Sequence, residues 1–383
     1  MKQKNKFHVL IVMIIALGFL LAGCQPNGEN KEEDTIKVGV IAPMSGKAAS
    51  YGEYVLNSLK IGINEFNNQS EAFNFKAIYE DGKCDPKESV TAIKKLMNVN
   101  DVDYIIGGFC SGETLGAAPI AEKNEIILLS PGSGSPDISD AGDYIFRNFV
   151  SDDFTAKSLA NIALEQGDKN MGLITENTDY PQTLKEAFID SYASKGGNIT
   201  LDETFTDKSL DFRTIITKAK NENIKNILVI VQSYKHADRL LKQMEELDYS
   251  PKIYTTESVV SSEALGSYGE GYKDKLNGAI FSHPKFNESR PKAKKLLEKY
   301  KVKHGSTEGP IPPLYLATYY DAPFLLGEAI NNAGNDPAKV KEYLYTIKGW
   351  NGAVGNFSFD EKGDAVLDVE VKTIQNGSIT TIS

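Results

Sequence analysis

Short apolar runs alternate with amphipathic stretches along most of the chain, beginning at Ile36. Most runs end in a loop of polar, aromatic or glycine residues, and a stretch with helical periodicity follows. Short, continuously apolar runs are typical of strands that are buried on both faces, and their regular alternation with helices is typical of parallel sheets. The pattern therefore predicts an α/β protein with doubly wound parallel sheets.

The first half of the chain carries one series of these units. We expect strands at 36–42, 75–80, 104–106 and 125–129, an apolar segment at 144–147, and helices at 51–66, from 86 onward and from 111 onward. The start of the second helix has a specific signal, because Asp85 can cap it and Pro86 suits its first position.

The second half repeats this plan without repeating the sequence. We expect helices at about 152–165, 182–194, 211–221, 236–247, 290–304, 313–332 and 337–347, and strands at 171–174, 198–203, 226–231, 252–254, 352–359 and 368–374. The ~350 residues that follow the N-terminal segment exceed what one hydrophobic core usually holds. We therefore predict two doubly wound lobes.

Two glycine- and serine-rich loops follow neighbouring strands within the stretch 103–137. One contains Gly107 and Gly108 and leads into a helix whose N-cap we expect to be Ser111; the other is the loop at 130–135. Ligands of open α/β sheets bind outside the carboxyl ends of the strands, and a helix N-terminus attracts anions. The two loops therefore predict a site for a small anionic group, unless Ser111 is only a helix cap.

The N-terminus has the pattern of an export signal. Three lysines precede an apolar segment at 9–20, which is shorter than a typical membrane span and ends in small residues directly before Cys24. This arrangement resembles the bacterial lipobox, so we predict a lipoprotein signal peptide at 1–23, a lipid on Cys24 and a flexible polar tether at 24–34. An uncleaved anchor and an ordinary signal peptide with a chance cysteine remain open.

The cysteine count agrees with export. Beside Cys24, the chain contains only Cys84 and Cys110, and each of these lies just past the end of a predicted strand. Because exported proteins can keep disulfides, we expect a Cys84–Cys110 bond. Two buried free thiols are the alternative.

Charge and motifs exclude several classes of function. Removing the signal takes three of the 42 basic residues away, so the net charge changes from −10 to −13. An acidic protein of this kind is not expected to bind nucleic acid. His236, His283 and His304 have no metal-ligand spacing, and we expect no metal and no cofactor. A nucleophilic Ser111 would lack a histidine base at a plausible spacing, so we expect no enzyme.

Several stretches together resemble a known family. They are IKVGVIAPMSGKAASYGE at 36–53, CDPKES at 84–89, GGFCSGET at 107–114, ILLSPGSGSPDI at 127–138, the loop at 179–180 and DEKGD at 360–364. From Ile36 onward, their order and spacing resemble the Leu/Ile/Val-binding type of ABC-transporter substrate-binding protein, a type I periplasmic binding protein. The resemblance also implies the Cys84–Cys110 disulfide.

The resemblance implies two α/β lobes that are joined by three crossings and close on a ligand. The crossings are expected near Val150, Ser282 and Gly352. The implied lobes are 35–150 completed by 283–352 for lobe 1, and 151–282 completed by 353–383 for lobe 2.

The resemblance also implies an amino-acid site between the lobes. Ser111 and the loop at 133–135 would hold the ligand carboxylate, Glu257 would pair with its ammonium, and Tyr51 and Tyr180 would line the cleft. The alternatives are a helix cap for Ser111, a surface acid for Glu257 and ordinary packing for the tyrosines.

Two positions depart from the family pattern. Gly134, between Ser133 and Ser135, stands where amino-acid binders often have a threonine, so one hydroxyl donor is missing or displaced. Ser233 stands where an aromatic residue is common, so the side-chain pocket is expected to be wider or differently lined.

We therefore expect a monomeric, membrane-tethered lipoprotein that captures an amino acid or a related small zwitterion by lobe closure and delivers it to the permease of an ABC importer. The alternative is a sensing module of the same fold that signals to a receptor partner. Closure would produce the affinity, because only the closed state makes both charged contacts.

Overall fold

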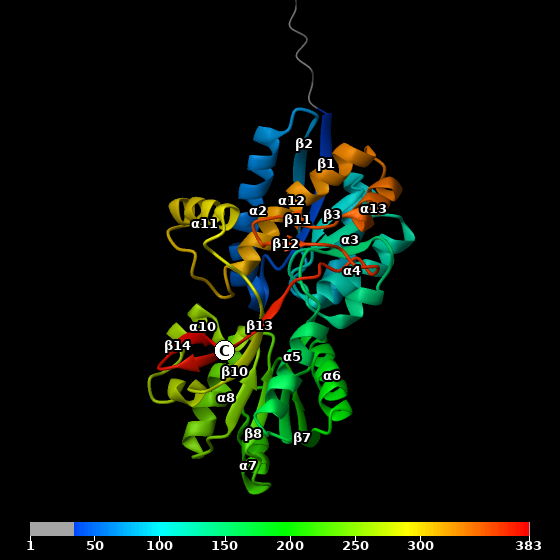
Figure 1. Cartoon of the computed structure of the whole chain (residues 1–383). Helices are drawn as coiled ribbons and strands as arrows, with labels where there is room; N and C mark the ends of the chain where they lie inside the picture. The colour runs from blue at the N-terminus through cyan, green and yellow to red at the C-terminus, as the bar shows by residue number, and fades with distance from the viewer. Residues whose placement is uncertain (1–33, 383) are drawn as a thin grey trace, which may run out of the picture. The chain divides into compact units, whose positions relative to one another are not determined.

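The computed structural model describes residues 34–382, which form two α/β lobes (Figure 1). The predicted signal peptide, the predicted lipidation site at Cys24 and the predicted tether up to residue 33 lie outside the described residues. Within 34–382, no helix is long and apolar enough to cross a membrane.

Lobe 1 is built on a five-stranded sheet with the order β2-β1-β3-β4-β5. Its strands are β1 (Asp34–Ala42), β2 (Phe73–Asp81), β3 (Tyr104–Gly107), β4 (Ile127–Ser130) and β5 (Ile145–Arg147). The neighbours from β1 through β3 and β4 to β5 pair in parallel, as the alternating pattern predicts. The helices of this lobe are α2 (Ala49–Gln69), α3 (Pro86–Asn100), α4 (Ser111–Lys123), α11 (Pro291–His304), α12 (Leu314–Ala333) and α13 (Pro337–Thr346).

Lobe 2 is built on a seven-stranded sheet with the order β14-β13-β10-β9-β8-β6-β7. Its strands are β6 (Asn170–Glu176), β7 (Asn198–Phe205), β8 (Asn226–Ile230), β9 (Lys252–Thr255), β10 (Ile280–Pro284), β13 (Val369–Gln375) and β14 (Ser378–Thr381). The strands from β7 to β10 pair in parallel, whereas β13 is antiparallel to both of its neighbours. The helices are α5 (Asp152–Glu165), α6 (Asp179–Ser194), α7 (Arg213–Asn221), α8 (Tyr234–Glu246), α9 (Glu257–Val260) and α10 (Ser262–Ser267).

Helix capping follows the sequence signals closely, with one exception. The side chain of Asp85 accepts hydrogen bonds from the N–H groups of Lys87 and Glu88, and Ser151 caps α5. The prediction that Ser111 caps α4 is wrong by one residue, because Cys110 is the N-cap and Ser111 is the first helical residue. Position 111 therefore lies on the open first turn of the helix.

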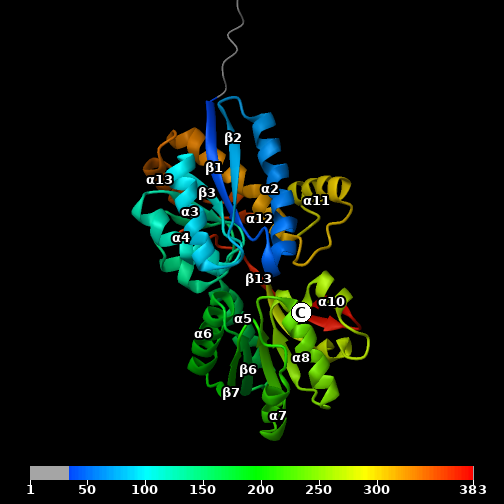
Figure 2. The same cartoon turned by 180° about the vertical axis from the view of Figure 1, so that it is seen from behind.

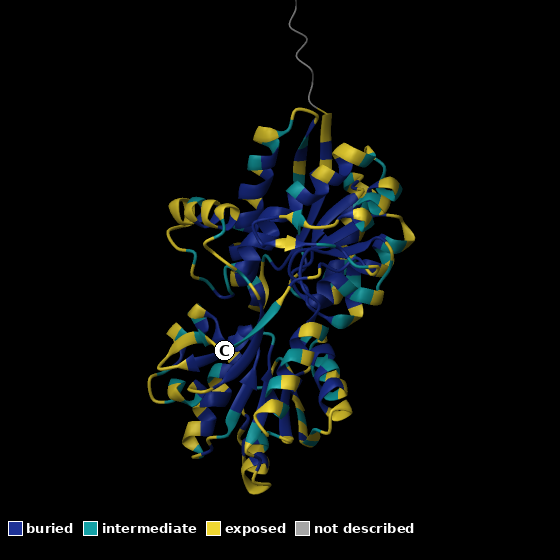
Figure 3. Ribbon diagram, in the orientation of Figure 1, coloured by how far each residue is buried: buried dark blue, intermediate teal, exposed yellow. Residues whose placement is uncertain are grey.

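Each sheet is covered by apolar clusters, and the buried strands form the interior of both lobes (Figure 3). In lobe 1, α2 and α12 lie side by side (Figures 1 and 2). A side-chain carbon at Gly62 of α2 would lie only 2.5 Å from the carbonyl oxygen of Tyr320. Glycine is therefore needed at Gly62 for the two backbones to approach so closely.

The third crossing lies later in the chain than the predicted position near Gly352. Ala353, Val354, Phe357 and Phe359 pack in the main cluster of lobe 1, and the chain joins the sheet of lobe 2 only at Val369. The buried carboxylate of Asp364 holds this segment on lobe 1 through an ion pair with Arg147 at 2.5 Å.

The predicted strand at 352–359 is replaced by a short hairpin. The strands β11 (Trp350–Asn351) and β12 (Asn356–Phe357) flank a loop. The carboxylate of Asp321 accepts hydrogen bonds from the N–H groups of Ala353 and Val354, both at 2.8 Å. These bonds bend the backbone into the loop.

Candidate functional site

A small cavity of about 40 Å³ lies between the two lobes. Most of the side chains that line it are buried. The lining residues are Tyr51, Phe109, Cys110, Ser111, Gly132, Gly134, Phe149, Asp152, Tyr180, Gln232, Glu257, Ser258, Ile311 and Tyr315. The set includes Ser111, Gly134, Tyr51, Tyr180 and Glu257 from the sequence-predicted site and leaves out Ser133, Ser135 and Ser233.

Lobe 1 presents the N-terminus of α4 to the cavity. Ser111 lies at its first position, where backbone N–H groups have no partner within the helix. The Ser111 hydroxyl oxygen accepts a hydrogen bond from the N–H of Ser135 at 3.1 Å, which leaves the hydroxyl proton available to a ligand. This end of the cavity suits an anionic group.

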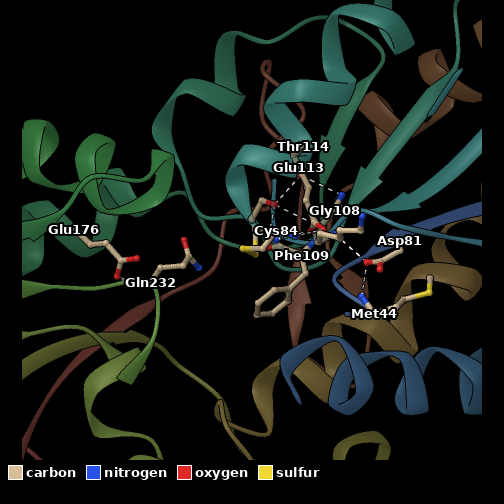
Figure 4. The surroundings of a disulfide bond; sticks show 12 residues. Met44, Asp81, Cys84, Gly108, Phe109, Glu113, Thr114, Glu176 and Gln232 are labelled. Atoms are coloured by element: carbon tan, nitrogen blue, oxygen red, sulfur yellow. Dashed lines mark hydrogen bonds between the residues drawn. A yellow bond between two sulfur atoms is a disulfide. The ribbon is translucent and has the colours of Figure 1, made fainter. Parts of the chain in front are cut away.

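A disulfide and a buried carboxylate hold the N-terminus of α4 in place (Figure 4). Cys84 and Cys110 are joined as the sequence predicts, with their Cα atoms 5.3 Å apart. Glu113 accepts hydrogen bonds from the N–H groups of Cys84, Phe109 and Cys110 at 2.9–3.0 Å. Burial raises the pKa of Glu113 to about 7, although these three N–H groups act in the opposite direction.

The loop after β4 contributes backbone and not hydroxyl groups to the cavity. The Ser133 hydroxyl turns inward and lies 2.7 Å from the Thr114 hydroxyl, and Ser135 caps a short 3-10 helix at Pro136–Asp140. Both serines support the loop from behind. Within the loop, Gly132 and Gly134 reach the cavity.

Lobe 2 presents Glu257, the first residue of α9. Its carboxylate is buried, and the Tyr315 hydroxyl from lobe 1 donates a hydrogen bond to it at 2.9 Å. Burial raises the pKa of Glu257, and the bond from Tyr315 acts in the opposite direction. Because no lysine, arginine or histidine within residues 34–382 lines the cavity, a ligand ammonium would be the natural counter-ion for this carboxylate.

Asp152 is a second buried acid on the cavity, and the sequence reasoning did not single it out. It is the first residue of α5, and its N–H donates a hydrogen bond to the carbonyl oxygen of Gly134 at 2.8 Å. A side-chain carbon at Gly134 would lie 2.1 Å from the Oδ2 atom of Asp152. The Asp152 carboxylate therefore occupies the space that a side chain at position 134 would need.

Gln232, rather than its neighbour Ser233, reaches the cavity from lobe 2. Ser233 caps α8, where its hydroxyl accepts a hydrogen bond from the N–H of Lys235 at 3.4 Å. The N–H of Gln232 donates to the carboxylate of Glu176 at 2.9 Å, and both residues extend from lobe 2 toward the disulfide (Figure 4). Ser233 is not among the residues that line the cavity, and its role in ligand binding stays a prediction.

Hydrogen bonds from both sides of the cleft join the lobes. Beside the Tyr315–Glu257 bond, the ammonium of Lys47 binds the carboxylate of Asp207 at 2.7 Å. The N–H of Glu263 also donates to the carbonyl oxygen of Gly309 at 3.4 Å. The structure is thus a closed state of the two lobes.

Several residues that line the cavity were not predicted, and the sequence contains only a partial signal for them. Asp152 is one of two acids at the start of a helix, where a carboxylate commonly serves only to stabilise the helix dipole. Phe109, Phe149 and Tyr315 have the apolar context of core residues. These residues differ from ordinary core or cap residues only because they face the cavity where the two lobes meet, and the local sequence does not show this.

Known proteins share both the sequence pattern and the fold. The family model described as periplasmic binding protein matches residues 35–378. The leucine-, isoleucine-, valine-, threonine-, and alanine-binding protein of Pseudomonas aeruginosa is 25% identical over 336 residues, which cover 86% of this chain and 87% of that protein. The Leu/Ile/Val/Thr-binding protein of Salmonella typhimurium is 27% identical and covers 90% of this chain and 93% of its own length.

Solved structures share the fold. A leucine-binding protein from Thermotoga maritima has a TM-score of 0.81 and 26% identity, covering 91% of this chain and 98% of that chain. A solute-binding protein from Rhodopseudomonas palustris in complex with 3,4-dihydroxybenzoic acid has a TM-score of 0.77 and 22% identity, covering 91% and 96%, and shows the fold alone. On the match across 35–378, the chain belongs to the periplasmic binding protein family.

Proposed function

We propose that the chain captures an amino acid or a related small zwitterion between its lobes and delivers it to an ABC importer outside the cytoplasm. One observation carries this proposal: the N-terminus of α4 on lobe 1 and the carboxylate of Glu257 on lobe 2 line the same cavity. The first suits a carboxylate and the second suits an ammonium.

The comparisons support the same class of ligand. Relatives that resemble this chain over most of its length carry names of amino-acid-binding proteins, and a structure from Streptococcus pneumoniae with a TM-score of 0.78 holds isoleucine. The proposal includes a lipid anchor on Cys24, which would keep the lobes next to a membrane-bound permease. It also includes binding without chemical change, since the sulfur of Cys110 is in the disulfide and no histidine lines the cavity.

Two substitutions test the proposal on the mature domain. After a thermal-shift screen has identified a bound amino acid, calorimetry should show that Ser111→Ala and Glu257→Gln each weaken its binding by about 1–3 kcal/mol, the usual loss for a charge-assisted bond. Glu270→Gln is the matched control, because Glu270 is an exposed acid of lobe 2 that does not line the cavity. Affinity retained in both site variants would refute the site assignment.

A further inference from the structure

A chain of hydrogen bonds connects the cavity to one of the contacts between the lobes. It begins at Gln232, which lines the cavity and whose N–H donates to Oε2 of Glu176 at 2.9 Å (Figure 4). The same oxygen lies 3.0 Å from Nδ1 of His236, near the start of α8. Nε2 of His236 lies 3.1 Å from the carbonyl oxygen of Asp207, which also accepts a hydrogen bond from the Lys47 ammonium at 2.7 Å. His236 therefore links the cavity wall of lobe 2 to the Lys47–Asp207 pair between the lobes.

Both ring nitrogens of His236 face oxygen atoms that accept hydrogen bonds. A carbonyl oxygen cannot donate, so the contact with Asp207 places a proton on Nε2. The contact with Glu176 needs a second proton, either on Nδ1 or on the carboxyl group. In water, imidazole binds a proton more tightly than a carboxylate does. The N–H of Gln232 also donates to the Glu176 carboxylate, which favours its ionised form. The second proton therefore belongs on Nδ1.

The charged groups around His236 favour a positively charged ring. Glu176 and His236 are only 3% and 8% exposed, and an ionised carboxylate that is so deeply buried needs a cationic partner. Among residues 34–382, His236 is the one basic residue within ion-pair distance of Glu176. The hydrogen bond from Lys47 lowers the pKa of Asp207, and the positive charges of Lys208 and His236 act in the same direction. The carboxylates of Glu176 and Asp207 thus both stabilise a charge on the ring.

We propose that His236 is a positioning residue for lobe closure, which as a doubly protonated imidazolium holds both the cavity wall at Gln232 and the loop that carries Asp207. A neutral ring would lose one of its two hydrogen bonds and leave a buried acceptor unpaired. The Lys47–Asp207 pair is exposed, and such a pair contributes little unless its geometry is fixed. The protonation of His236 goes beyond the proposed function, and only its effect on ligand affinity rests on that function.

NMR of the mature domain with isotope-labelled histidine rings tests the protonation directly. At neutral pH we expect the nitrogen signals of His236 to be those of an imidazolium. His283 and His304 are references for the neutral ring, because burial lowers the pKa of both, and that of His283 to about 3. Replacing each histidine by glutamine assigns the signals. A neutral His236 ring in the folded wild-type domain would overturn the proposal, whatever ligand the protein binds.

A substitution of the acidic partner tests the source of the charge. In Glu176→Gln an amide N–H can donate to Nδ1, so the His236 ring needs one proton and its signals should become those of a neutral ring. Glu203→Gln is the matched control, because Glu203 lies on the neighbouring strand β7 and pairs with Lys218 instead. An imidazolium that persists in folded Glu176→Gln would contradict the assignment.

Calorimetry measures the consequence for closure, with the standard amino acid that gives the largest thermal shift as the probe. His236→Gln should weaken its binding about tenfold, the loss expected for one charge-assisted hydrogen bond. His304→Gln, at an exposed position at the end of α11, should leave the affinity unchanged. Lys47→Ala should weaken binding less in the His236→Gln background than in the wild type, because both residues act through Asp207.

The binding results separate this inference from the proposed function. Equal effects of Lys47→Ala in the two backgrounds would overturn the link between His236 and the pair that joins the lobes. If no amino acid binds to the wild type, the proposed function fails, and the NMR experiment still decides the protonation of His236.

Discussion

Asp152 has a protonation state that its position at the start of a helix does not predict. It is buried beside Glu257 on a cavity without basic residues, and its Oδ2 atom has no hydrogen-bond partner among the described residues. Burial, with a smaller contribution from the charge of Glu257, raises the pKa of Asp152 to about 8. At neutral pH the ligand-free closed form therefore holds a proton on this carboxyl group.

Binding of an ammonium group at pH 7 is expected to release this proton. A cation beside Asp152 favours the ionised carboxylate, so its pKa falls on binding and the affinity rises with pH until about pH 8. Calorimetry in buffers of different ionisation enthalpy measures the number of protons released. In Asp152→Asn the release should fall, and the rise of affinity with pH should flatten.

Asp153→Asn serves as the control for this experiment. Asp153 is adjacent in the chain and does not line the cavity, and its charge contributes only a minor part of the raised pKa of Asp152, so its replacement should change proton release much less than Asp152→Asn does. Wild-type proton release in Asp152→Asn would contradict the assigned role of Asp152.

Some residues of the site could be predicted from the sequence, and others could not because their orientation depends on tertiary contacts. Ser111 and Glu257 each begin a helix shortly after a strand ends. The family resemblance implies a ligand-binding role at both positions. The inward orientation of the Ser133 hydroxyl depends on Thr114 from another element, and the use of Ser233 as a cap depends on where α8 begins. Such orientations are decided by tertiary packing and are not visible in the pattern.

Among the larger elements, the crossing segments depend on a buried ion pair. The guanidinium of Arg147 binds both carboxylate oxygens of Asp364, at 2.5 and 2.7 Å, and also donates to the carbonyl oxygen of Ser135 at 2.7 Å. One residue thus links the loop behind the cavity, the end of β5 and the segment that leads to β13. Both charged side chains are buried or nearly so.

Removing one partner of this pair should destabilise the protein strongly. Asp364→Ala leaves the Arg147 guanidinium buried without its counter-ion, and we expect the free energy of unfolding to fall by about 3–5 kcal/mol in urea titrations. Asp140→Ala, which breaks the exposed Lys362–Asp140 pair, should change it by less than about 1 kcal/mol. Equal effects of the two substitutions would show that Arg147–Asp364 has no special role.

The helices and parallel strands could be predicted from periodicity, whereas the irregular elements could not. The helix predicted at 182–194 begins earlier, at Asp179, because Pro181 fits the first turn of α6. The strands β10 and β14 have no prediction at all. β10 lies at a crossing between the lobes, and β14 is a short edge strand that pairs only with β13. The pairing of β10 with β13 joins residues that are distant in the sequence, whereas β14 pairs with its neighbour β13 through the turn at Asn376 and Gly377, which is a local hairpin signal.

Taken as a whole, the ligand-free protein contains several buried acids whose protons favour the folded state. Burial raises the pKa of Asp152 to about 8 and those of Glu113 and Asp321 to about 7. Such a group contributes stability that is fully present below its unfolded pKa, near 4, and is lost as the pH rises through its folded value. Burial lowers the pKa of His283 to about 3, so its contribution has the opposite sign but is complete above about pH 6.5.

The thermal midpoint of the ligand-free domain should therefore fall as the pH rises from about 6.5 to about 8.5. In this window the three acids release in the folded state protons that the unfolded state has already lost, so all three act in the same direction, whereas His283 opposes them only near pH 6.5. Differential scanning calorimetry at the two pH values measures the effect, and Asp152→Asn should reduce it. A midpoint that rises over this interval would contradict the assigned protonation states.

The contacts between the lobes also determine how quickly a ligand can be exchanged. A ligand that binds both lobes is expected to leave when the Tyr315–Glu257 bond and the Lys47–Asp207 pair break. The residence time of a ligand is then set by the rate at which the lobes separate, and not by diffusion out of an open groove. A permease that takes up the ligand would have to accelerate this separation by binding to both lobes at the rim of the cleft.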